Sequence, residues 1–221
     1  MNKIYVVGIG PGNIENMTFE AYDTLKKSDI IIGYKTYIEL IKDEFKDKEL
    51  ISSPMKKEVD RCKDVLELAK SGKVVSLISS GDAGVYGMAG IMLEVGGDQC
   101  EIIVIPGVTA CNAAAAVVGA PIMHDSVNIS LSDLLTDWEL IKKRVALASE
   151  GDFVIALYNP KSNGRITQLD EAREIMMKKK KKTVYAIKFL NKDYSIEIHS
   201  LKTKKIKEKT LFKNNLLPLR I

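Results

Sequence analysis

The amino-acid sequence predicts an α/β fold built on a parallel sheet, and three observations support this prediction. Short apolar runs without polar alternation are typical of strands that are buried on both faces. Segments with helical spacing separate these runs, and such alternation indicates an α/β protein. Glycine-bearing loops follow three of the runs, and ligands of open parallel sheets bind at the carboxyl ends of the strands.

Five apolar runs are the expected strands. In chain order they are KIYVVGIG (3–10), DIIIGY (29–34), VVSLIS (74–79), EIIVIPG (101–107) and DFVIALYNP (152–160). One helix is predicted by an apolar stripe whose members are Val59, Cys62, Leu66 and Ala69. Gly72, in KSGK, is the expected stop of this helix, because glycine favours the backbone conformation that ends helices.

The pattern changes after VTACNAAAAVVGAP, and we place a domain boundary near Pro121. The alanines of this segment favour tight helix packing. SVNISLSDLL then predicts a strand, and a helix is expected from about Asp137 to Ala148. The prediction is therefore an N-terminal α/β domain over residues 1–121 and a C-terminal α/β domain over residues 122–221.

The composition argues against several classes of protein. A hydrophobic content of 46% and a charged content of 28% are ordinary for a soluble globular protein. No apolar segment approaches the ~20 residues that span a bilayer, and the apolar run of the N-terminus is too short for a secretory signal. Three separated cysteines and two histidines offer little to a disulfide or a metal centre. We expect a cytoplasmic protein with no metal and no membrane partner.

The basic charge of the chain lies in its tail. From Lys178 onward there are 14 Lys and Arg against 3 Asp and Glu, a net +11 within a total of +4, so residues 1–177 carry −7. Binding of nucleic acid would need a basic face with aromatic platforms, and the body offers neither. We expect no nucleic-acid partner, and a solvated face or end explains the charge run.

The three glycine-bearing loops are GIGPGN (8–13), SSGDAGVYG (79–87) and PGVTA (106–110). The first matches a dinucleotide fingerprint only in part, because Asn13 stands at the third glycine position and Pro11 lies inside the turn. An NAD site is therefore a minor alternative. In the second loop, Asp82 can accept hydrogen bonds from a ligand's ammonium group or cap its own turn. Thr109 offers a hydroxyl in the third loop.

Taken together, five segments resemble the tetrapyrrole methylase family of cobalamin biosynthesis. They are VGIGPG, SSGDAGVYGMAG, PGVTACNAAAAVVGAP, HDSVNISLSDLLTDWELI and DFVIALYNPKSNGR, and they span roughly four-fifths of the chain. Within the family, GDAGVYGMAG, ISLSDLLTDWE and ALYNP are most similar to the members that methylate precorrin-3B or cobalt-precorrin-3 at C-17. The resemblance implies two αβα domains with a cleft between them, a homodimer, and a C-methyltransferase that also contracts the macrocycle.

The resemblance also implies the cofactor S-adenosylmethionine and the residues that contact it. These are Pro11, Ser80, Gly81, Asp82, Val85, Thr109, Ala110 and Tyr158. The chemistry agrees, because the ammonium of the cofactor suits Asp82 and its carboxylate suits loop N–H donors. Methyl transfer from a sulfonium mainly requires that the two reactants are held in line, so a glycine-rich site suffices.

Contraction of the macrocycle requires proton movement, and His124 with Asp125 is the candidate acid–base pair. A solvated turn at the domain junction explains these two residues equally well. The candidate contacts to the tetrapyrrole substrate are Tyr34, Ser130, Asp133 and Arg144. Lys35 and Arg165 are further candidate cations for its carboxylates, although exposed cations are usually solvated.

Two other functions stay open at this point. A sibling enzyme could methylate another carbon, and a binding protein could retain the cofactor site without turnover. Sequence also leaves open whether the substrate contains cobalt.

The tail departs from the family pattern after EAREIMM, where a strand and a glycine-bearing loop are expected. Five lysines, Lys178–Lys182, open a tail that has no glycine, although TVYAIKFL and YSIEIHSL still predict two strands. We hypothesise that residues after about Lys182 are frame-shifted or strongly diverged. The C-terminal domain would then be atypical after about residue 178, with weakened closure over the cofactor and low activity.

Overall fold

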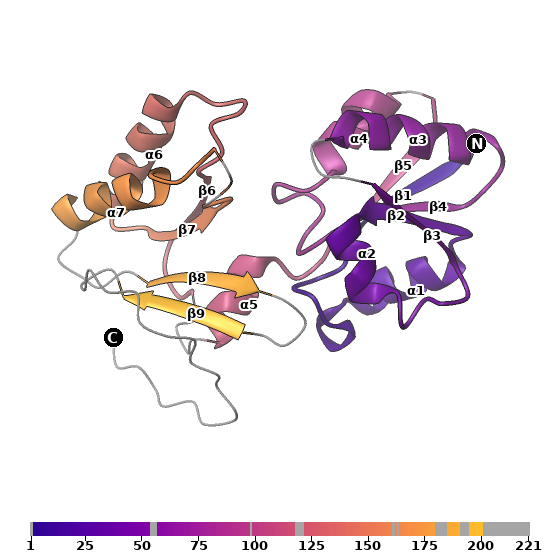
Figure 1. Ribbon diagram of the computed structural model, residues 1–221, viewed down its shortest axis with the longest axis horizontal. Coiled ribbons are helices and arrows are strands. Elements are labelled where there is room, and N and C mark those ends of the chain that lie inside the picture. Colours follow the sequence, from indigo (N-terminus) through magenta and orange to yellow (C-terminus); the bar gives the residue numbers. More distant parts are fainter. Residues whose placement is uncertain are drawn as a thin grey trace. The chain divides into compact units, whose positions relative to one another are not determined.

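The computed structural model describes residues 2–53, 57–97, 99–117, 122–160, 162, 164–179, 185–190 and 195–200. The chain forms two compact units, residues 1–113 and 114–221, which we call the N-terminal unit and the C-terminal unit (Figure 1). Pro121, where the sequence places a domain boundary, lies outside the described residues, and that boundary stays a prediction.

The N-terminal unit is built on a five-stranded sheet in the order β3-β2-β4-β1-β5. Its strands are β1 (Lys3–Gly8), β2 (Ile30–Tyr34), β3 (Glu49–Ser53), β4 (Val75–Ser79) and β5 (Glu101–Ile105). Its helices are η1 (Ile14–Asn16, a 3-10 helix), α1 (Phe19–Lys27), α2 (Lys35–Ile41), α3 (Glu58–Lys70), α4 (Ala89–Gly96) and the start of α5 (Ala110–Val117). All paired strands run parallel, and the predicted α/β fold is confirmed.

Helices cover both faces of this sheet, which explains why its central strands are largely apolar. On β1, Ile4 and Val6 pack in the cluster that contains residues of α3 and α4, whereas Val7 packs with α1 and α2. Figure 1 shows α3 and α4 over one face and α1 and α2 over the other. Side chains alternate between the faces of a strand, so apolar layers on both sides demand apolar residues at successive positions.

Three strand ends bring the glycine-bearing loops together. β1 lies between β4 and β5 in the sheet, and Gly8 is in register with Ser79, while Val7 is in register with Ile105. The loops that follow these strands therefore meet at one edge, as the sequence predicts. The strand β3 is an addition to the prediction, because its residues ELISS are short and mix polar with apolar positions.

The C-terminal unit contains β6 (Ser126–Ser130) and β7 (Val154–Tyr158), which pair in parallel, and the helices α6 (Trp138–Glu150) and α7 (Gln168–Lys179). The inner residues of both helices pack with Ile129 and Leu131 in one core. The predicted strand is confirmed over Ser126–Ser130 only, and residues 131–135 lie outside it. The predicted helix after Asp137 is confirmed, and the Asp137 carboxylate caps it by accepting from the backbone N–H of Glu139.

The tail also forms the two strands that its alternation predicts. β8 (Tyr185–Leu190) and β9 (Ser195–Ser200) pair antiparallel as a separate two-stranded sheet. Residues 180–184, 191–194 and 201–221 lie outside the described residues. The hypothesis of a frame-shifted or diverged tail therefore stays a prediction.

Candidate active site

The first and second loops of the N-terminal unit are joined through their backbones. The N–H of Gly10 donates to the carbonyl of Gly81 at 3.0 Å, and the N–H of Gly81 donates back to the carbonyl of Gly10 at 2.7 Å. The N–H of Ile9 donates to Ser79 at 2.9 Å and extends the strand pairing to the base of the loops. These three hydrogen bonds are made by main-chain atoms alone.

Glycine at position 107 allows the third loop to approach the first two. A Cβ added there would collide with the carbonyl oxygens of Gly81 and Gly8, both of which are backbone atoms. A Cβ added at Gly8 would in turn lie 2.8 Å from the nitrogen of Gly107. Gly81 has a φ of +69°, in the region that favours glycine. The three loops meet only because these positions lack side chains.

Asp82 joins the second loop to the third. Its Oδ1 accepts from the N–H of Gly84 at 2.8 Å, and its Oδ2 accepts from the N–H of Gly107 at 2.9 Å. The interpretation that Asp82 caps its own turn is therefore correct, and the bond to Gly107 is a second role. Each carboxylate oxygen can accept more than one hydrogen bond, so Asp82 retains capacity for a ligand.

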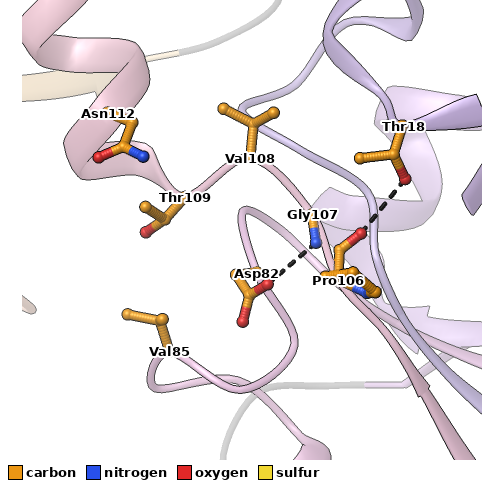
Figure 2. A pocket seen from close by; sticks show the side chains of 8 residues that line it. All are labelled: Thr18, Asp82, Val85, Pro106, Gly107, Val108, Thr109 and Asn112. Atoms are coloured by element: carbon orange, nitrogen blue, oxygen red, sulfur yellow. Dashed lines mark hydrogen bonds between the residues drawn. The ribbon is translucent and has the colours of Figure 1, made fainter.

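A pocket of about 460 Å³ lies beside this junction. Its lining residues come from the start of α1, the second and third loops and the first turn of α5, and they are Thr18, Asp82, Val85, Pro106, Gly107, Val108, Thr109 and Asn112 (Figure 2). Thr18 caps α1 by accepting from Ala21 at 3.1 Å, and its hydroxyl donates to the carbonyl of Pro106 at 3.2 Å. The pocket combines an apolar wall with one carboxylate, hydroxyls and backbone groups, which is the usual make-up of a small-molecule site.

The structure brings together three of the residues that the resemblance assigns to the cofactor, because Asp82, Val85 and Thr109 all line the pocket. Gly81 lies beside it, and an added Cβ there would be 3.7 Å from the Cα of Thr109. Pro11, Ser80 and Ala110 belong to the same loops without lining the pocket, and Tyr158 lies in the C-terminal unit. Their contacts to a cofactor stay predictions.

Sequence reasoning assigned no role to five lining residues, Thr18, Pro106, Gly107, Val108 and Asn112. Thr18 could have been found as a helix cap, because a threonine directly before a helical segment is a common cap.

A second cluster of polar side chains lies at the carboxyl ends of β6 and β7. Ser130 accepts from the side-chain amide of Asn159 at 3.0 Å. Asp133 accepts from the side chain of Gln168 at 3.0 Å, and its Oδ1 lies 3.4 Å from Nη1 of Arg165. Arg165 is 8% exposed and also donates to Ser132 at 3.3 Å. The backbone N–H of Ser132 donates to Ser130 at 3.2 Å, so the predicted substrate residues Ser130 and Asp133 belong to one network.

Opposing effects set the ionisation of Asp133. Burial raises its pKa, but hydrogen bonds from its own backbone N–H, from Gln168 and from Arg165 outweigh that effect and hold the pKa below its ordinary value. The carboxylate is charged at neutral pH and is matched by Arg165. Arg165 therefore has an internal partner and is no solvated surface cation.

The remaining candidates neither line the pocket nor take part in the second cluster. His124 and Asp125 are exposed and directly precede β6, where the carbonyl of Asp125 accepts from the N–H of Val154 at 2.9 Å. Arg144 is exposed on α6. Tyr34 ends β2 at the same edge of the sheet as the three loops, and its ring packs edge-on against Tyr37 at 5.4 Å. Lys35 follows it and is exposed. Their roles in catalysis and substrate binding stay predictions.

In the part of the chain that the structure describes, no cluster of three His, Cys, Asp or Glu side chains could hold a metal ion. None of the helices described is long and apolar enough to cross a membrane.

Comparison with known proteins identifies the relatives of this chain. The model of the Tetrapyrrole (Corrin/Porphyrin) Methylases matches residues 3–193. The chain is 51% identical, over 174 residues, to a probable cobalt-factor III C(17)-methyltransferase of Salmonella typhimurium, covering 77% of this chain and 72% of that protein. It is 49% identical, over 183 residues, to the cobalt-factor III methyltransferase of Priestia megaterium, covering 80% of this chain. The chain spans only 34% of that longer protein.

Among solved structures, the methyltransferase CobJ is similar, with a TM-score of 0.83 and 33% identity over 93% of this chain and 89% of that one. The cobalt precorrin-4 methyltransferase CbiF, at 20% identity and a TM-score of 0.72, shares the fold.

Proposed function

We propose, because this chain belongs to the tetrapyrrole (corrin/porphyrin) methylase family, that it transfers a methyl group from S-adenosylmethionine to C-17 of a cobalamin precursor. The observation that carries the proposal is the pocket at the carboxyl edge of the sheet, which is lined by Asp82, Val85 and Thr109. These residues belong to the loops whose sequences resemble the family.

The residues of the pocket fit S-adenosylmethionine. The volume of about 460 Å³ lies in the range of small-molecule sites, and the absence of a Cβ at Gly107 leaves backbone groups within reach. Asp82 would hold the ammonium group, and Val85 and Val108 supply apolar surface for the adenosine. When bound, the cofactor supplies an electrophilic methyl group on a sulfonium.

The chain itself contributes shape and orientation. The backbone bridge between Gly10 and Gly81 fixes the second loop, and Asp82 fixes the third loop against it, so the pocket is formed before a ligand enters. Such preorganisation accelerates group transfer because the reactants lose their freedom of orientation on binding and not in the reaction. For contraction of the macrocycle, His124 and Asp125 are proposed to move protons, and their exposure leaves them accessible to a substrate.

The names of relatives favour a cobalt-containing substrate. The proteins from Salmonella typhimurium and Priestia megaterium, at 51% and 49% identity, are named for cobalt-factor III. The precorrin-3B C(17)-methyltransferase of Sinorhizobium is 40% identical over 78% of this chain. Cobalt-factor III is therefore the first substrate to test, and precorrin-3B is the second. We further propose that the protein acts as a cytoplasmic homodimer.

The test is incubation of the purified protein with S-adenosylmethionine and each tetrapyrrole. The expected product carries one additional methyl group by mass spectrometry and has a changed absorption spectrum. Methylation at another carbon, located by NMR, would identify a sibling activity. Calorimetric binding of S-adenosylmethionine without turnover of either tetrapyrrole would identify a binding protein instead.

Two variants assign the parts of the site. Gly81→Val places a β-branched residue at a φ of +69° beside Thr109, and we expect S-adenosylmethionine to bind at least tenfold more weakly, about 1.4 kcal/mol. Unchanged affinity in a folded variant would remove the pocket from the proposal.

His124→Ala should give methylated product that is not contracted. Wild-type product at the wild-type rate would leave His124 as a turn residue.

A further inference from the structure

The second loop contains a tyrosine in a backbone conformation that suits glycine. Tyr86 has a φ of 55°, and the other non-glycine residues with positive φ in the described ranges are Asp152 and Asn159. Aspartate and asparagine tolerate this region, whereas a bulky aromatic residue there is an outlier. The turn is tightly wound around it, because a Cβ added at the next residue, Gly87, would lie 2.5 Å from the carbonyl oxygen of Ala83.

The core does not account for the ring of Tyr86, because the residue is 52% exposed. Glycine would satisfy the same backbone with less strain. Strained residues that persist in a structure cluster at functional sites, and an observed outlier is a valid starting point for a functional hypothesis. The phenol ring is thus held at the surface of this loop against the preference of its backbone.

The position of Tyr86 relative to the pocket suggests which ligand it contacts. Val85 and Asp82 line the pocket, whereas Tyr86, which directly follows Val85, does not. An exposed aromatic residue that directly follows a lining residue without lining the pocket itself is a candidate contact for the second reactant. A tetrapyrrole is a large, flat, conjugated ring system, and such surfaces pack favourably against aromatic side chains.

We propose that Tyr86 is a substrate-contacting residue whose ring packs against the tetrapyrrole macrocycle while Asp82 and Val85 serve the cofactor. This inference rests on the proposed function for the identity of the substrate. It predicts that the ring matters more than the hydroxyl. It also predicts that the residue favours function at the expense of stability.

The experiment compares Tyr86→Gly and Tyr86→Phe, with Asp152→Gly as the matched control. Asp152 has a φ of 56°, lies in the turn between α6 and β7 of the C-terminal unit, and does not line the pocket. The readouts are the Kd of cobalt-factor III by absorption titration in the presence of S-adenosylhomocysteine, the Kd of S-adenosylmethionine by calorimetry, the KM, and the Tm.

Tyr86→Gly should weaken binding of cobalt-factor III about tenfold and raise its KM similarly, with S-adenosylmethionine affinity within about twofold of wild type. Its Tm should be unchanged or raised by up to about 3 °C, because relief of strain offsets the flexibility of glycine. Asp152→Gly should leave both affinities and the KM unchanged. Tyr86→Phe should stay within about twofold of wild type for the tetrapyrrole.

Equal tetrapyrrole affinity in wild type and Tyr86→Gly would overturn the inference, as would a Tm loss of more than about 5 °C, which would make the ring structural. A selective loss of S-adenosylmethionine affinity would assign Tyr86 to the cofactor and also overturn it. Failure of the proposed function is distinguishable: wild-type protein that binds cobalt-factor III without methylating it contradicts the activity, while the titration still decides the role of Tyr86. Wild-type protein that binds no tetrapyrrole overturns both.

Discussion

The two units hold the carboxyl ends of their parallel strands by different means. In the N-terminal unit, the loops after β1, β4 and β5 meet through the paired backbones of Gly10 and Gly81 and through one carboxylate, Asp82, that accepts from two backbone N–H groups. In the C-terminal unit, the segments after β6 and β7 meet through side chains, with Asp133 bound by Arg165 and Gln168.

This difference determines which substitutions each edge tolerates. Backbone groups are fixed in position, so the N-terminal edge is sensitive to added atoms and to any loss of its one acceptor. Side-chain donors can rotate, and an amide can turn its oxygen toward a new donor, so the C-terminal edge can adjust. We expect the largest loss of stability from a substitution at a glycine of the N-terminal edge, a smaller loss from substitution of a carboxylate, and the smallest effect from a change of pH.

Gly107→Ala should have the largest effect. The added methyl group meets the carbonyl oxygens of Gly81 and Gly8, and neither can move without separating the loops. We expect a loss of roughly 2–4 kcal/mol of stability, a fall of about 5–12 °C in Tm, and a loss of S-adenosylmethionine affinity of more than about tenfold. Differential scanning calorimetry and titration calorimetry measure these quantities.

Gly90→Ala is the control, since among the described residues nothing beyond its chain neighbours and its own helix backbone lies within 4 Å of an added Cβ at this position in α4. Its Tm should be unchanged or raised, because alanine favours helices over glycine. If Gly107→Ala behaved like this control, the close approach of the three loops would be unnecessary for the pocket.

A comparison of Asp82→Asn with Asp133→Asn tests the effect of substituting the carboxylate at each edge. Asparagine at position 82 turns its NH₂ group toward one of two fixed backbone N–H donors, so a bond is lost and donors face each other. We expect a loss of about 1–2 kcal/mol and a threefold to tenfold loss of cofactor affinity. At position 133, the amide oxygen can still accept from Arg165, and Gln168 can turn its own oxygen toward the new NH₂ group at the expense of the bond it accepts from the N–H of Thr167. The Tm should therefore fall by less than in Asp82→Asn, by about 2 °C. Equal melting losses in the two variants would show that the edges do not differ.

The smallest effect should come from a pH response in the C-terminal unit. The indole N–H of Trp138 donates to Glu171 at 2.9 Å, and this bond, with that from the hydroxyl of Thr167, lowers the pKa of Glu171 below its ordinary value. A lowered pKa in the folded state stabilises the protein above the unfolded pKa of about 4.3, and the contribution is lost as the pH falls through the lowered value.

Trp138 is the single tryptophan of the chain, so its fluorescence reports on this bond directly. We expect an emission change on acidification below about pH 4 that Glu171→Gln largely removes, because the neutral amide still accepts from the indole without titrating. An identical acid transition in Glu171→Gln would assign the change to another group.

The fold of the N-terminal unit was predictable because its central strands are marked in the sequence by apolar runs. Ile30 to Ile32 are buried on both faces, and no polar residue interrupts them, so the run itself indicates a covered parallel strand. The edge strand β3 carries no such signal, since Glu49 and Ser52 are exposed. Burial on both faces is visible in a sequence, whereas pairing at an edge is not.

The candidate site was predictable only in part. The glycines mark loops that approach one another, but the partner of each glycine depends on the strand order, which no local pattern contains. The bond from Asp82 to Gly107 joins residues 25 positions apart, and the contact of Thr18 with Pro106 joins residues 88 positions apart. Sequence identified the residue types, and the sheet topology determines which of them meet.

At the N-terminal edge, the contacts that form the pocket and the side chains that determine its specificity belong to different residues. Val85 and Val108 form part of the wall without entering the Gly10–Gly81 bridge or the bonds of Asp82, so they can be exchanged while those joints persist. Gene duplication followed by substitution at such wall positions would alter what the pocket admits without unfolding the loops that build it. A site formed by main-chain contacts can therefore change its substrate by substitution of its lining side chains. In a site formed by side-chain contacts, the same substitutions would also remove the contacts that form it.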